Sequence, residues 1–140
     1  MNYSLQNLTA VSECDMLLSW ATREKAGLSH RKMTGEFNTI KFAQTAAEIA
    51  AALVGVNAEL QANEMVIASV PAGSDAMEEA IDKKVRLEYK KFLLENRKEN
   101  FGATALIEKE VDLARVDQEL NEVEAFMALV TEKKNMLLMA

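Results

Sequence analysis

The stretch that decides the fold of this chain is "LIEKEVDLARVDQELNEVEAFMALVTEKKNML", residues 106–137. Apolar side chains recur in it at intervals of three and four residues, the spacing of the positions that face a partner helix in a coiled coil. The repeat fails only at Lys109 and Lys134. Its members are Leu106, Leu113, Val116, Leu120, Val123, Met127, Val130 and Leu137. We predict a helix of coiled-coil character in which Leu113, Leu120, Met127 and Leu137 are core or interface residues.

The composition of the whole chain is that of a helical protein. Among 140 residues there are 5 Gly and 1 Pro, so few turns are expected. Strong helix formers (Ala, Glu, Leu, Lys and Met) are frequent instead. With 49% hydrophobic and 27% charged residues the chain is globular rather than disordered. We predict an all-α fold, with residues 1–140 in a single helical domain.

Turn residues divide the chain into four predicted helices, about 9–34, 38–69, 75–98 and 103–138. Gly27 and Gly35, among Ser, Thr and Asn residues, mark the first connection. Pro71 and Gly73 mark the clearest break, because Pro cannot continue a helix and Gly permits a tight turn. Asp75 is the expected N-cap of the helix that follows.

The region around Gly102 leaves one alternative open. The seven-residue spacing continues across it, and an interior Gly costs a helix only about 1 kcal/mol, so a single helix from Asp75 to Met136 is possible. Several Glu residues would interrupt the apolar row there, and we therefore expect a turn. The predicted architecture is an elongated bundle of two antiparallel helical hairpins, residues 1–70 and 75–140, separated by the break at 70–74.

Residues 43–60, "AQTAAEIAAALVGVNAEL", are rich in small side chains. Seven of these 18 residues are Ala, and only Glu48 and Glu59 are charged. Small side chains allow two helix backbones to approach to the short end of the usual range of about 8–10 Å. We expect this helix to lie between neighbours, in its own chain or with one of them in another subunit; the alternative is that alanine serves helix propensity alone. The candidate contact residues are Ala43, Ala47, Ala50 and Ala51.

No membrane span is expected in this alanine-rich helix. Its longest uncharged apolar run, "IAAALVGV", has eight residues, whereas a spanning helix needs about 20. The amino-terminal residues lack the basic and continuously apolar regions of a secretory signal. A cytoplasmic location is the resulting expectation.

The residues that usually carry chemistry are scarce. One Cys and one His cannot supply a zinc site, and Gly27 stands three residues before His30, where a di-iron site of the ferritin type needs Glu. Cys14 lies on an apolar stripe, where a thiol usually acts as a small hydrophobic side chain. No glycine-rich phosphate loop is present. We predict a non-enzyme with no catalytic residue, cofactor, metal or small-molecule substrate.

The net charge of −6 argues against nucleic acid as a partner. Residues 81–100 nevertheless hold seven basic and four acidic residues, and residues 101–132 hold two basic and eight acidic residues. Two basic stretches, 23–32 and 83–91, are candidate anion-binding surfaces, although solvated helix faces explain them more simply. Their residues are Arg23, Lys25, Arg31, Lys32, Lys83, Lys84, Arg86, Lys90 and Lys91.

The sequence favours a function in assembly. A regular helical repeat, an alanine-rich helix and few catalytic residue types are typical of a non-enzymatic scaffolding protein. Such a protein acts through helix–helix contacts with itself, as a homo-oligomer, or with another helical protein. The alternative is a small adaptor that binds a partner peptide or nucleic acid through the basic stretches.

Overall fold

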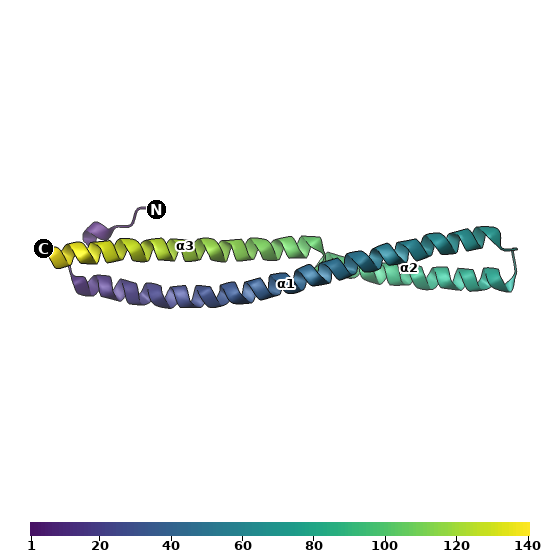
Figure 1. The fold of residues 1–140 in the computed structure, drawn as a ribbon, viewed down its shortest axis with the longest axis horizontal. Helices are drawn as coiled ribbons and strands as arrows, with labels where there is room; N and C mark the ends of the chain where they lie inside the picture. Colours follow the sequence, from purple (N-terminus) through teal and green to yellow (C-terminus); the bar gives the residue numbers. More distant parts are fainter. The chain divides into compact units, whose positions relative to one another are not determined.

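The computed structural model describes residues 1–140 and contains helices but no strands (Figure 1). A short 3₁₀ helix, η1 (Leu5–Asn7), is followed by α1 (Val11–Ser69), α2 (Asp75–Phe101) and α3 (Ala103–Met139). The predicted all-α fold is confirmed. Contacts divide the chain into two units, Met1–Phe37 with Glu110–Ala140, and Asn38–Lys109.

Helix α1 is continuous at the point where we expected the first connection. Gly35 is helical, and a Cβ built on it would lie 3.2 Å from Leu113 Cδ1 of α3. The glycine therefore accommodates a closely packed neighbour instead of making a turn, and this contact offsets its low helix propensity. The expected division into helices 9–34 and 38–69 was wrong.

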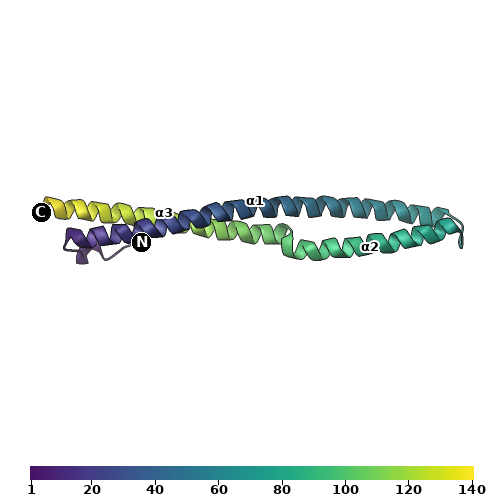
Figure 2. The same cartoon turned by 90° about the horizontal axis from the view of Figure 1, so that it is seen from below.

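Because α1 does not turn back, it pairs with a different segment in each unit (Figures 1 and 2). In the first unit it lies antiparallel to α3, as the ion pairs Asp15–Lys134 (2.6 Å) and Lys32–Asp117 (2.9 Å) demonstrate. In the second unit it lies antiparallel to α2, where Glu64 pairs with Lys84 (3.4 Å). The hairpin expected within residues 1–70 is absent.

The buried side chains of α1 recur every seven residues. A row with this interval stays on one face of a helix and contacts one partner along its length. In the first unit the row comprises Cys14, Ala21 and Leu28, and in the second unit Ile49, Val56 and Asn63. Opposite them, α2 buries Ala80 and Leu87, and α3 buries Val116, Leu120 and Val130. Leu113, Met127 and Leu137 of α3 are half-buried.

Side chains near the starts of α1 and α2 accept hydrogen bonds from backbone N–H groups at those ends. The carboxylate of Glu13 accepts from the backbone N–H of Thr9 (3.2 Å) and of Ala10 (3.0 Å) at the start of α1. The N-cap of α2 is Ser74, one residue before the expected Asp75, and its Oγ accepts from the N–H of Met77 (3.2 Å). These bonds satisfy N–H groups that have no partner inside the helix.

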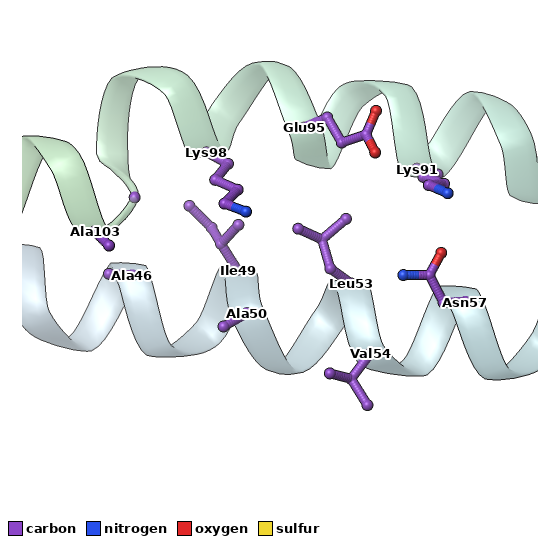
Figure 3. Close-up of a pocket in the computed structure, with 11 residues that line it drawn as sticks. Ala46, Ile49, Ala50, Leu53, Val54, Asn57, Lys91, Glu95, Lys98 and Ala103 are labelled. Carbon is purple, nitrogen blue, oxygen red and sulfur yellow. The ribbon is translucent and has the colours of Figure 1, made fainter.

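At Gly102 the chain breaks without reversing. The Gly102 N–H still donates to Lys98 O (2.8 Å), and its carbonyl accepts from the Leu106 N–H (3.1 Å). Figure 3 shows Lys98 beside Ile49 and Ala103 beside Ala46, so residues on both sides of the break lie along α1. The break is thus neither the expected hairpin turn nor part of one uninterrupted helix.

Two glycine substitutions test whether the break at residue 102 requires a glycine. A Cβ on Gly102 would lie 2.4 Å from Lys98 O, whereas a Cβ on Gly55 would meet nothing within 4 Å. We expect Gly102→Ala to lower the free energy of unfolding by about 1–3 kcal/mol. Gly55→Ala should raise it by about 0.5–1 kcal/mol, because it lies inside a helix. Urea denaturation measures both free energies of unfolding. A Gly102→Ala protein as stable as the native one would contradict the expected clash between the new Cβ and Lys98 O.

Candidate functional site

A hollow of the second unit lies between α1 and α2 and has a volume of about 400 Å³ (Figure 3). Ile49 and Leu53 of α1 point toward α2 and form its apolar side, whereas Lys91, Glu95 and Lys98 of α2 form the charged side. The remaining lining residues are Ala46, Ala50, Val54, Asn57, Gly102 and Ala103.

The chemistry available in this hollow is limited to contact and charge. Lys91 and Lys98 stand seven residues apart, with Glu95 between them, so the charged side carries two ammonium groups and one carboxylate. The lining contains no Ser, Thr, Cys or His that could act as a nucleophile or imidazole base. The hollow is therefore better suited to bind an apolar side chain next to a charged group of a partner than to carry out a reaction.

The four alanines that we expected to make close contacts are all exposed. Ala43, Ala47, Ala50 and Ala51 lie away from the buried row of Ile49 and Val56. The physical reason is that α1 has a single neighbour in this unit, and small residues on its other sides have nothing to pack against. Within one chain, residues 43–60 are therefore not the central helix that we expected.

The basic stretch 23–32 faces acidic residues of α3. Lys25 pairs with Glu124 (3.4 Å), Arg31 with Glu119 (3.8 Å) and Lys32 with Asp117 (2.9 Å). The hydrogen bond from Lys32 to Asp117 raises the pKa of Lys32. These pairs neutralise charge that a bound anion would otherwise use.

The basic stretch 83–91 belongs to the other unit. Lys84 is half-buried and pairs with Glu64, and Lys91 is half-buried beside the hollow. The other basic residues of the two stretches are exposed: Arg23, Lys83, Arg86 and Lys90.

Asn63 is a buried polar residue that the sequence analysis missed. Its side chain is 5% exposed, and its Nδ2 donates to the backbone carbonyl of Ala80 (2.7 Å). A buried amide in a row of apolar residues fixes the relative position of two helices, because a shift would leave it without a partner. Its place seven residues after Val56 puts it in the buried row, but the sequence alone does not show that this row is the buried one.

The amino-terminal segment packs on the first unit through aromatic rings. The Tyr3 ring meets Phe126 edge to face at 5.0 Å, and Phe126 meets Trp20 in the same way at 6.1 Å. The Tyr3 hydroxyl donates to the Glu122 carboxylate, and this hydrogen bond raises the pKa of Tyr3. Tyr3 therefore anchors the start of the chain, a contact that only the fold reveals.

Two further features bear on the kind of site present. The structure gathers no group of three or more His, Cys, Asp or Glu side chains suited to hold a metal ion.

Helix α1 is long and apolar enough to cross a membrane by length and composition, and 11% of its most apolar stretch is buried. One such helix is weak evidence for a membrane span; core helices of soluble proteins can be as long and apolar, but they are mostly buried.

The geometry thus presents helix faces, a hollow between α1 and α2, and paired charges. Cys14, the only thiol, is fully buried. No protein-family model, curated protein or solved structure matches this chain.

Proposed function

We propose that this protein is a non-enzymatic assembly protein that acts through helix–helix contacts, as a homo-oligomer built from coiled-coil helix pairs. The observation that carries the proposal is the number of large apolar side chains that remain exposed to solvent. A pair of helices buries one face of each and leaves the opposite faces to solvent. In the second unit the exposed residues include Ile40, Val54, Met65, Ile81, Val85, Tyr89 and Phe92.

The total accessible surface supports the same proposal. The chain exposes 9851 Å² for a mass of 15.5 kDa. A compact monomer of this mass exposes about 7,200 Å², so the excess is about 2,600 Å². Interfaces of obligate homodimers bury about 2,000–5,000 Å² in total. The exposed excess is therefore sufficient for a stable interface between copies.

The solution mass tests this proposal directly. We expect size-exclusion chromatography with light scattering to give a mass of two or more times 15.5 kDa. This mass should stay the same over a hundredfold range of protein concentration. A mass of 15.5 kDa at every concentration would contradict the homo-oligomer. A cytoplasmic location, which suits a chain with one unpaired cysteine, is part of the proposal.

The second candidate is a binding adaptor that uses the basic surface of α2. The exposed side chains of Lys83, Arg86 and Lys90 support it. Binding of an acidic peptide or a single-stranded oligonucleotide should then weaken steeply as salt rises. Binding that does not depend on salt would rule out this surface as the recognition element.

A further inference from the structure

Helix α1 carries a second row of residues on the face opposite α2, here called the outer row. It repeats at alternating intervals of four and three residues, and all of its members are exposed. Its large apolar members Ile40, Val54 and Met65 are 59%, 71% and 74% exposed. Figure 3 shows Val54 pointing away from α2 while Leu53 points toward it. The outer row comprises Ile40, Gln44, Ala47, Ala51, Val54, Ala58, Gln61 and Met65.

The outer row differs from an ordinary solvated helix face. The outward face of a surface helix normally carries charged side chains, but this row contains none, and its two polar members, Gln44 and Gln61, are uncharged. Its average interval of three and a half residues is that of the buried row through which α1 contacts α2. A row with this interval can lie along another helix over its whole length.

We infer that the outer row binds the outer row of a second copy, antiparallel, around a two-fold axis midway between Ala51 and Val54. This inference rests on the proposed homo-oligomer and names its interface. Two-fold symmetry requires a patch that is complementary to itself. The row meets this requirement, because apolar residues stand at equal distances from the axis on both sides, and so do the two glutamines.

The pairs that this axis creates match in polarity. In an antiparallel pair around this axis, each residue faces the residue of the second copy that lies at the same distance on the other side of the axis. Counted outward, small Ala51 lies opposite Val54, Ala47 opposite Ala58, the amide of Gln44 opposite that of Gln61, and large Ile40 opposite Met65. A side-chain amide both donates and accepts, so the two glutamines can hydrogen-bond to each other across the interface.

Small side chains at the centre explain what the alanine-rich stretch does. Ala47, Ala51 and Ala58 lie close to the axis, and Ala50 and Gly55 stand beside the row as further small, exposed residues. Two backbones can then approach to about 8 Å, where dispersion contact is greatest. The alanines are exposed in the single chain because their neighbour is another chain.

The charges beside the outer row favour the antiparallel direction. Lys41 stands beside one end of the row, and Glu64, which pairs with Lys84 of its own chain, stands beside the other. Antiparallel copies bring the end with Lys41 to the end with Glu64, so that opposite charges gather at each end. A parallel pair in register would instead bring the two Glu64 carboxylates together, where like charges repel.

Single cysteines provide the first test, because the native Cys14 is fully buried and is expected not to react. We expect Val54→Cys to give a covalent dimer with a short bismaleimide, since both copies place this residue beside the axis. Glu88→Cys, at an exposed residue of α2 that is not among the exposed apolar side chains, is the control and should stay monomeric on a denaturing gel. The substitution Val54→Asp should raise the dimer dissociation constant about a hundredfold without loss of helicity.

A mixture of two variants tests the direction. Ile40 and Met65 stand about 38 Å apart along the helix, at opposite ends of the row. We expect Ile40→Cys and Met65→Cys to cross-link when they are unfolded and refolded together, but neither to cross-link alone. Cross-linking of Ile40→Cys with itself would overturn the antiparallel arrangement.

The outcomes separate this inference from the proposed function. A native protein that is oligomeric, with a Val54→Cys variant that does not cross-link, overturns the outer-row interface and leaves the homo-oligomer standing. A native protein that is monomeric overturns both. If that monomer also floats with phosphatidylcholine vesicles in a density gradient, lipid rather than a second copy covers the row.

Discussion

Replacement of Leu120 by Asp is expected to unfold the first unit. Leu120 is 8% exposed and packs with Leu28 and Val116, and Val123 lies against this cluster. An aspartate there would bury a charge among apolar side chains with no partner. Leu→Ala at a buried site already costs about 2–5 kcal/mol, and small proteins are stable by only about 5–15 kcal/mol. The helical circular dichroism signal should therefore fall sharply at 25 °C.

A graded pair of variants makes this result interpretable. Leu120→Ala should remain folded with a lower thermal midpoint, because it removes contacts but adds no charge. Leu138→Asp, on the same helix at a side chain that is 61% exposed, should leave the midpoint almost unchanged. A Leu120→Asp protein as helical and as stable as Leu138→Asp would exclude Leu120 from the core.

Replacement of Asn63 by Asp should destabilise the second unit in a manner that depends on pH. The two side chains have nearly the same shape, but an ionised carboxylate cannot donate to the carbonyl of Ala80, which Asn63 contacts at 2.7 Å. Two acceptors would then face each other at a buried site, at a cost of about 3 kcal/mol near pH 7. Thermal unfolding followed by circular dichroism measures the loss.

The pH dependence has a definite sign. Burial and the facing carbonyl raise the pKa of the introduced carboxyl in the folded state above its unfolded value of about 3.9. The Asn63→Asp protein should therefore be closest to native stability below about pH 4, where the protonated carboxyl can donate. Stability should be lost as the pH rises through the folded pKa. Asn57→Asp, at an exposed position, is the control, and equal pH profiles for the two variants would contradict the buried contact.

The buried face of α3, though not the helix that covers it, could be predicted from its sequence because its two sides differ strongly. Leu120 and Val130 stand in an apolar row among charged residues, so only one face can be buried. The two lysines that interrupt the row are also accommodated. The Lys109 ammonium lies 5.4 Å from the centre of the Phe42 ring, and Lys134 pairs with Asp15. A long side chain can lie along an apolar contact with its charge outside.

The orientation of α1 and α2 could not be predicted in the same way. Ile40, Val54 and Met65 recur along one side of α1, as buried residues of a helix do, but all three are exposed. Helix α1 has apolar or small residues on nearly every side in this region, so periodicity alone does not select the face that contacts α2. In α2 the large apolar residues at helical spacing are also exposed, whereas Ala80 and Leu87 are buried. The exposed residues are Ile81, Val85, Tyr89 and Phe92.

The connection expected at residues 34–38 was missed for a different reason. Gly35 has the same identity whether it ends a helix or receives a neighbouring side chain, and only the position of Leu113 distinguishes the two. The hollow beside Ile49 likewise depends on which residues of α2 face α1. Both features need the pairing of segments far apart in the sequence, which local patterns do not contain.

The turn at Pro71 has a consequence for the order in which the chain folds. The hydrogen bond between Asn63 and Ala80 closes a loop of 17 residues, whereas the one between Tyr3 and Glu122 spans 119. The entropy lost on closing a loop increases with its length, so contacts near the turn form at the lowest cost. Each contact formed shortens the loop that remains for the next one. Pairing therefore spreads outward from the turn, and the two chain ends are the last segments to join.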